Sequence, residues 1–135
     1  MEYRKEGNKH FFLFDTEPVP ASRPRVSRYG TYYGKTYNAY RKAFQEEVSE
    51  FRKEFRPLLS DRLKIEAFFL VKKPKTSKLN HPRGDIDNYL KALLDSCNEL
   101  VWRDDVQITE VSATKEFDEV GSIELIVEDL DEYTP

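Results

Sequence analysis

The chain has 135 residues, 39% hydrophobic and 35% charged, which is enough for one domain with one core and too little for two. No apolar stretch approaches the roughly 20 residues that cross a bilayer, so a membrane-spanning segment is excluded and a soluble chain is expected. The net charge of −3 argues against a uniformly basic nucleic-acid binder, and the single cysteine, Cys97, excludes an internal disulfide and favours a reducing cytoplasm.

The first half of the chain predicts a strand, a long loop, a helix and a second strand. His10 to Glu17 reads as a strand, ended by the prolines that follow it. Pro18 to Tyr37, rich in proline, basic residues and tyrosine, is expected to form an extended loop or irregular hairpin turning at Gly30. Apolar residues spaced by three or four predict an amphipathic helix from Asn38 to Phe55. Alternating apolar residues predict a strand from Arg62 to Lys72.

The second half predicts a loop, a helix and two strands. Lys73 to Gly84 contains prolines and polar residues and is expected to be a loop. Asp87 to about Leu100 has the apolar stripe of a helix, while Val106 to Phe117 and Ser122 to Asp129 alternate as strands. Gly121, between these two strands, favours an antiparallel hairpin.

The order of these elements predicts an α+β fold, with two main helices packed on a mixed β-sheet. No linker or shift in composition divides the chain, so residues 1–135 are expected to form a single domain, with residues 1–9 and 130–135 as frayed tails. The apolar stripe of the first helix, Cys97 on the second, and Trp102 just beyond it are expected in the core.

Charged residues are distributed unevenly along the chain. Nucleic acid therefore remains a candidate partner in spite of the negative net charge. Residues 18–42 and 72–83 contain basic side chains and no acidic one, whereas residues 116–135 contain acids and no base. Because a surface field follows the local arrangement of charge, the two basic segments are expected to contact DNA phosphates. The residues assigned to DNA binding are Arg23, Arg25, Arg28, Lys35, Lys72, Lys73, Lys75, Lys78 and Arg83.

The strongest chemical signal is a group of acids around the second helix. Asp85 and Asp87 lie two residues apart, so they share one side only where the backbone is extended. Asp85 is therefore placed in an extended lead-in and Asp87 at the helix N-cap, a position that favours Asp. Lys91 follows one turn later on the same side, and Asp95, another turn on, is placed to tether it.

A second acidic pair, Asp104 and Asp105, follows Trp102 and is expected to return toward the first pair, with one of the two reaching it. Carboxylates held together repel unless a cation neutralises them, and oxygen sites of this kind suit Mg²⁺ or Mn²⁺. Two alternatives stay open, in which the acids only cap helices and turns or bind calcium. A calcium loop of the EF-hand type, counted from Asp85, needs glycine where Leu90 stands.

The run Asp85-Ile86-Asp87-Asn88, followed by Lys91 and then by Trp102-Arg103-Asp104-Asp105-Val106-Gln107, resembles the RusA family of Holliday junction resolvases. A looser match is the proline- and arginine-rich segment Pro18–Arg25. The chain departs from the family at residues 99–101, which read Glu-Leu-Val where the family often carries a glycine.

The resemblance implies a RusA-like homodimer that binds Mg²⁺, with Mn²⁺ as a substitute, and resolves four-way DNA junctions by paired symmetric nicks in recombination and repair. It places the metal ligands at Asp85, Asp87 and Asp105, with Asp104 as the alternative to Asp105. It places an essential catalytic lysine at Lys91. The alternative functions are a non-catalytic DNA-binding module and a related magnesium nuclease that acts on other branched or duplex DNA. No membrane partner is expected.

Overall fold

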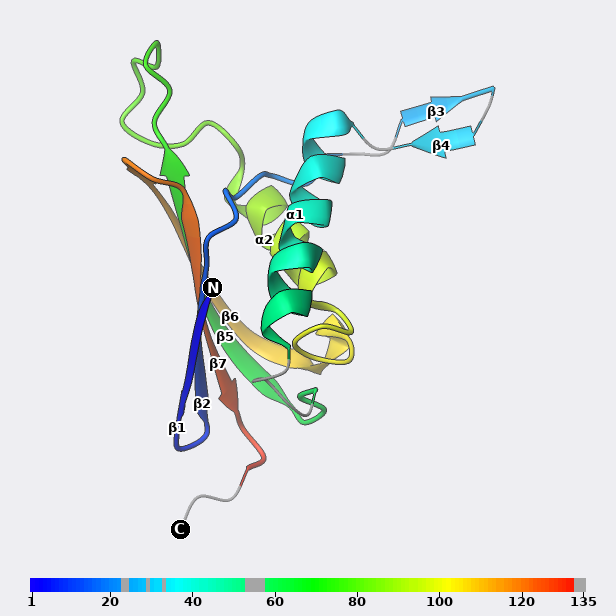
Figure 1. Cartoon of the computed structure of the whole chain (residues 1–135), viewed down its shortest axis with the longest axis vertical. Helices are drawn as coiled ribbons and strands as arrows, with labels where there is room; N and C mark the ends of the chain where they lie inside the picture. Colours follow the sequence, from blue (N-terminus) through cyan, green and yellow to red (C-terminus); the bar gives the residue numbers. More distant parts are fainter. Residues whose placement is uncertain (23–24, 29, 33, 53–57, 133–135) are drawn as a thin grey trace.

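The computed structural model describes residues 1–22, 25–28, 30–32, 34–52 and 58–132. Two helices, α1 (Lys35–Phe51) and α2 (Ile86–Cys97), cover one face of a five-stranded sheet, and a small hairpin projects beside them (Figure 1). The predicted α+β fold, a mixed sheet that carries two helices, is confirmed. Among the described helices, none is both long and apolar enough to span a membrane.

The sheet has the strand order β1-β2-β7-β5-β6. Its strands are β1 (Glu2–Glu6), β2 (Lys9–Phe14), β5 (Leu63–Lys72), β6 (Ile108–Asp118) and β7 (Ser122–Asp129). β5 and β6 run parallel because α2 connects them as a crossover, whereas the other neighbouring pairs are antiparallel. The loop before α2 therefore leaves the carboxyl end of β5, the edge at which open α/β sheets place their ligands.

The predicted hairpin between β6 and β7 is wrong, because β5 lies between these strands. β5 carries apolar residues on both faces, including Phe68 and Leu70, as is typical of a central strand. Residues 119–121 carry the chain past the end of β5. Gly121 suits this crossing because the Glu17 carboxylate occupies the space that a side chain there would need.

The predicted frayed start, residues 1–9, is also wrong, since β1 forms the outer edge of the sheet. A turn joins β1 to β2 at Gly7, whose φ of 58° glycine adopts without strain. The Tyr3 hydroxyl contacts Nδ1 of His10 at 2.8 Å, which fixes the edge strand against the core. At the other terminus, Leu130 N donates to the carbonyl of Arg62 at 2.9 Å, so the chain is tied down there too. Residues 133–135 lie outside the described part of the chain.

The apolar stripe of α1 packs over the sheet as predicted, with the Phe44 ring 4.6 Å from the Phe14 ring of β2. The helix begins at Lys35, three residues before the predicted start, and its predicted end at Phe55 lies outside the described residues. Trp102 and Cys97 are fully buried, as expected. The buried residues of α1 are Tyr37, Tyr40, Phe44 and Val48.

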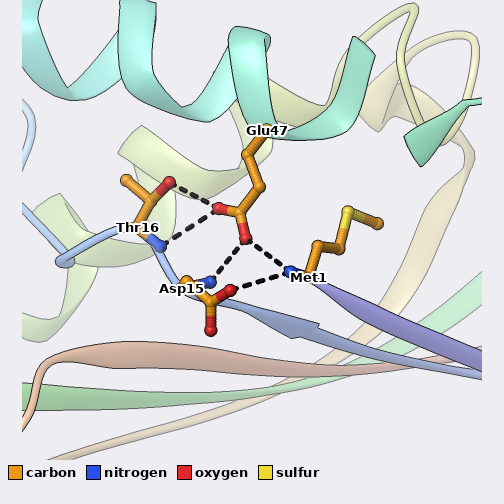
Figure 2. Close-up of polar contacts among 4 residues, drawn as sticks. All are labelled: Met1, Asp15, Thr16 and Glu47. Carbon is orange, nitrogen blue, oxygen red and sulfur yellow. Dashed lines mark hydrogen bonds and ion pairs between the residues drawn. The ribbon is translucent and has the colours of Figure 1, made fainter. Parts of the chain in front are cut away.

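Glu47 on α1 fixes the end of β2 and the chain that follows it (Figure 2). Its carboxylate accepts hydrogen bonds from the backbone N of Asp15 at 2.6 Å and from the backbone N and hydroxyl of Thr16 at 3.0 and 2.6 Å. The Met1 amino group pairs with Asp15 at 2.8 Å and with Glu47 at 3.4 Å. These contacts end β2 three residues before the predicted end of this strand and turn the chain out of the sheet.

The chain then passes the start of α2 before it forms the hairpin. Ala21 N donates to the carbonyl of Asn88 at 2.8 Å, so residues 18–22 lie against the first turns of α2. Beyond them, β3 (Arg25–Ser27) pairs with β4 (Gly30–Tyr32), so a hairpin forms as predicted, but Gly30 pairs with Ser27 as the first residue of β4 and the predicted turn at Gly30 is wrong. Figure 1 shows this hairpin projecting beyond the start of α1.

Candidate active site

The chemistry predicted from the sequence gathers at the start of α2. Loop 73–84 reaches the helix there, and residues 18–22 lie alongside, so parts of both basic segments approach the same end of α2 (Figure 1). Gly84, the last residue of the loop, packs directly on a tyrosine ring, since a Cβ at Gly84 would lie 2.8 Å from Cε2 of Tyr89. This packing sets the direction in which the next residue, Asp85, enters the helix.

Asp85 and Asp87 are both exposed at the helix N-terminus, but their places differ from the prediction. Asp85, rather than Asp87, is the N-cap, with an extended backbone at φ −70° and ψ 140°. Its carbonyl accepts hydrogen bonds from Asn88 N at 3.1 Å and Tyr89 N at 3.2 Å. Because Ile86 already takes up helical geometry, the helix begins one residue earlier than predicted and Asp87 falls in its first turn.

The Asp85 carboxylate makes no capping hydrogen bond, although it occupies the capping position. A carboxylate that stabilised the helix would accept from the backbone N–H two or three residues further on. The alternative in which this aspartate only caps a helix therefore loses its support. Two exposed carboxylates, Asp85 and Asp87, fit a hard cation, since Mg²⁺ is usually held by one or two carboxylates together with substrate phosphates.

Lys91 lies one turn along α2 from Asp87. Its Nζ pairs with Oδ2 of Asp95 at 3.2 Å, which confirms the predicted tether. The lysine side chain is 65% exposed, and exposed pairs at this helical spacing contribute only about 0.3–0.5 kcal/mol to stability. A phosphate approaching this end of the helix can therefore compete with Asp95 for the ammonium group.

The second acidic pair begins a short 3₁₀ helix, η1 (Asp105–Gln107). Asp104 is its N-cap: Oδ1 accepts from Val106 N at 3.0 Å, and Asp104 N donates to Oε1 of Gln107 at 2.8 Å. Asp105 is half-buried, and burial together with the neighbouring Asp104 and Asp95 carboxylates raises the pKa of its carboxyl group. Asp104 is thus engaged in capping, which favours Asp105 of the two as the candidate metal ligand.

The two acidic pairs do not meet within one chain. Asp105 lies close enough to Asn98, the C-cap of α2, for that side chain to affect its pKa, whereas Asp85 occupies the N-cap position, and the 12 residues of the helix span about 18 Å. In the described part of the chain, no three His, Cys, Asp or Glu side chains are grouped to hold a metal ion. The predicted convergence of the two pairs is therefore wrong for a single chain. The chain returns toward the N-terminus of α2 only along β6, and Asp104 and Asp105 come before β6 begins. The roles of Asp85, Asp87 and Asp105 as metal ligands stay a prediction.

Loop 73–84 presents positive charge immediately before Asp85. An open pocket of about 590 Å³ lies between this loop and the end of the sheet, with Lys78, Arg83 and Phe117 in its wall. Gly84, the residue before Asp85, also lines the pocket, whereas Asp85 and Asp87 do not form part of its wall. An anion is attracted to this surface by its cations, which can offset the repulsion of the carboxylates. The exposed basic residues here are Lys72, Lys73, Lys75, Lys78 and Arg83.

The other predicted DNA contacts that the structure describes lie in the projecting hairpin and at the start of α1. Arg28, in the turn between β3 and β4, and Lys35, the first residue of α1, are both exposed. Arg25 is the first residue of β3, and Arg23 lies outside the described residues. DNA binding by these residues and by loop 73–84 stays a prediction.

Two residues without a predicted role hold the region together. Lys115 in β6 donates from Nζ to the carbonyl of Pro82 at 2.9 Å and to that of Gly84. Gln107 donates to the carbonyls of Leu59 at 3.2 Å and Asp61 at 2.7 Å, which fixes the turn around Asp104. The sequence contains one feature that could have drawn attention to Lys115: it is the one basic residue of β6, and the other charged residues of this strand are acidic.

Comparison with known proteins agrees with the motifs. A profile of the family described as Endodeoxyribonuclease RusA matches residues 15–128, a range that includes both acidic pairs and Lys91. A protein of Bacillus subtilis (strain 168) described as "Uncharacterized protein YqaN" is 29% identical over 48 residues, which are 36% of this chain and 34% of that protein. Since the profile covers most of the sequence, the chain belongs to the RusA family of endodeoxyribonucleases.

Proposed function

We propose that this chain is a Mg²⁺-dependent endonuclease that resolves four-way DNA junctions by paired symmetric nicks. Membership of the RusA family supports a junction as the substrate. The observation that carries the proposal is the exposed pair Asp85 and Asp87, which follows directly after Gly84 in the wall of a basic pocket and in which Asp85 makes no capping hydrogen bond. Carboxylates alone repel a phosphodiester, so the pair suits this substrate only with a cation and flanking bases.

Each group has a distinct task in this proposal. Asp85 and Asp87 hold the ion, which when bound polarises the scissile phosphate and lowers the pKa of a coordinated water. Lys91 supplies positive charge one turn further along the helix and offsets the charge that develops on the phosphate oxygens. Lys78 and Arg83 attract the DNA backbone to the pocket, a contribution that weakens as salt concentration rises.

A homodimer completes the proposal, because two strands of a junction must be cut. A twofold pair of sites matches the pseudo-twofold symmetry of a four-way junction. It also offers a place for Asp105, whose own chain holds it at the far end of α2 from Asp85. If Asp105 is a ligand of the same ion, a second copy of the chain has to supply it.

Nicking of defined substrates tests the function. The purified protein is incubated with a synthetic four-way junction, a flap and a plain duplex, each with and without Mg²⁺. We expect nicks at mirrored positions of the junction, and only in the presence of the ion. Equal nicking of flap or duplex would instead indicate the related branched-DNA nuclease. Tight junction binding without nicking in any metal would indicate a non-catalytic module and overturn the proposal.

Mixing two inactive variants tests the shared site. Asp85→Asn and Asp105→Asn copies are mixed under conditions that exchange subunits, after sedimentation has established that the wild type is a dimer. If Asp105 acts across the dimer, each mixed dimer has one intact site and recovers nicking of one strand. If each chain builds its own site, both sites of the mixed dimer are defective and no activity returns.

A further inference from the structure

Lys115 lies on the face of the sheet that carries the helices. Its register partner in β5 is Phe69, a residue of the buried core. The lysine side chain is half-buried, whereas Glu110, Glu116 and Asp118 of the same strand are exposed. An ammonium group in this position needs hydrogen-bond acceptors, because burying an unpaired charge is costly.

The acceptors belong to the loop that leads into α2. Nζ of Lys115 donates to the carbonyl of Pro82 at 2.9 Å and to the carbonyl of Gly84. Within the described chain, the backbone hydrogen bonds of loop 73–84 lie away from this turn: Ser77 N donates to Pro74 O, and Lys73 N donates to Asp118 O. A side chain from β6 therefore supplies hydrogen bonds that the loop backbone does not make for itself at its last turn.

Holding Gly84 has a direct effect on Asp85. The carbonyl of Gly84 and the N and Cα atoms of Asp85 lie in one peptide plane, which is rigid because the peptide bond does not rotate freely. Lys115 bonds the oxygen of this plane, while the Tyr89 ring and the Pro20 side chain pack against Gly84 at 2.8 and 3.0 Å from the place of a Cβ. The plane is thus held from two sides, and the start of the Asp85 side chain is held with it.

We infer that Lys115 is a positioning residue of the proposed metal site. It holds the peptide that carries Asp85 and so sets this carboxylate relative to Asp87 on the first turn of α2. The consequence for catalysis rests on the proposed function, whereas the effect on the turn does not. Loss of a group that orients a metal ligand typically lowers metal affinity or activity by about 10–100-fold.

The experiment compares Lys115→Met and Lys115→Arg with a control, Lys64→Met. Lys64 is also half-buried, but it lies on β5 with its side chain on the opposite face of the sheet. Backbone hydrogen exchange is measured in metal-free protein at Asn88 and Tyr89, whose amides donate to the carbonyl of Asp85. Mn²⁺ binding is measured by calorimetry, and the Mg²⁺ concentration that gives half-maximal nicking is measured on the junction.

For Lys115→Met we expect exchange at these two amides to rise about tenfold, as after loss of one or two hydrogen bonds. Mn²⁺ affinity should fall by about 10–100-fold, and the Mg²⁺ requirement should rise by a similar factor. Lys115→Arg, which keeps donors at the end of a long side chain, should recover most of both losses. Lys64→Met should behave as the wild type in all three measurements.

Unchanged exchange and unchanged Mn²⁺ affinity in a folded Lys115→Met protein would overturn the inference. If Lys115→Met does not fold, the same measurements are made on Lys115→Gln, whose shorter side chain cannot reach the carbonyls of both Pro82 and Gly84. Faster exchange in the variant, combined with a wild type that nicks no DNA, would overturn the proposed function and leave the positioning of Asp85 by Lys115 intact.

Discussion

The two ends of α2 use aspartate in opposite ways. At the N-terminus, Asp85 and Asp87 are exposed, and Asp85 makes no capping hydrogen bond. Beyond the C-terminus, Asp104 accepts from a backbone N–H and pairs reciprocally with Gln107, next to the fully buried Trp102. An aspartate near a helix is therefore a candidate for chemistry where the backbone has not already engaged its oxygen atoms.

The position of each end in the sheet explains the difference. The N-terminus of α2 stands at the carboxyl end of β5, where a loop opens the structure and leaves a basic pocket. The C-terminal end stands where β6 begins, and the chain there is tied to residues 59–61 through Gln107. The first end is thus free to meet a ligand, while the second stabilises the fold.

Removing the tryptophan at the structural end should have the largest effect. Trp102 is fully buried, and its indole N donates to Oδ1 of Asn98 at 2.8 Å. We expect Trp102→Ala to lower the free energy of unfolding by about 3–5 kcal/mol, measured by urea denaturation. Val106→Ala is the control, since Val106 is 80% exposed and its loss should change stability by at most about 0.5 kcal/mol. If Trp102→Ala lowered the free energy of unfolding by less than about 1 kcal/mol, the structural role of this end of α2 would be contradicted.

Changing one aspartate at the open end should remove activity without unfolding the protein. We expect Asp85→Asn to lower the rate of junction nicking by more than about 100-fold, a larger loss than follows removal of a supporting partner of a metal ligand. Junction affinity, measured by gel shift, should persist or increase because one negative charge is gone. Glu110→Gln, at an exposed position of β6, is the matched control and should nick at the wild-type rate.

Alanine at each of the two cap positions compares the ends directly. Asp104→Ala removes an N-cap that makes its hydrogen bonds and should lower the free energy of unfolding by about 1 kcal/mol. Asp85→Ala removes a carboxylate with no capping bond and should change it by less than about 0.5 kcal/mol. Equal losses of stability in the two variants would show that Asp85 serves the helix after all.

The smallest expected effect concerns pH and Asp105. Burial, followed by the neighbouring Asp104, raises the pKa of Asp105 above its ordinary value of 3.8, so the native chain binds this proton more tightly than the unfolded chain. This tighter proton binding adds to the free energy of unfolding. The contribution is fully present below pH 3.8 and is lost as the pH rises through the higher pKa of the native chain. We expect Asp105→Asn to be more stable than the wild type at pH 7 and to lose this advantage near pH 4, measured by denaturation at both values. If the stability difference between Asp105→Asn and the wild type were the same at both pH values, the raised pKa of Asp105 would be contradicted.

Patterns within one element predicted local structure well, and pairing between distant strands poorly. The strand predicted from Arg62 to Lys72 forms as β5 with a one-residue difference, because alternating burial leaves a clear signal. The hairpin predicted at Gly121 fails, since nearness in sequence favours pairing only if no other strand takes the place between. β1 is missed because Glu2–Glu6 is an edge strand in which charged residues outnumber apolar ones.

The sequence by itself determined the residue types of the site and the family. The motif D-x-D-N followed by a lysine is defined by short spacings along the chain, and these spacings can be recognised without knowing the tertiary structure. Only the tertiary structure decided which of these residues are neighbours. The rise of an α-helix is the same for every sequence, so the 12 residues of α2 span about 18 Å and separate the end near Asp105 from the end at Asp85 within one chain. Strand pairing brings Lys115, from the other side of this helix in sequence, to the carbonyl of Gly84. Contacts of this kind join residues that no local pattern connects.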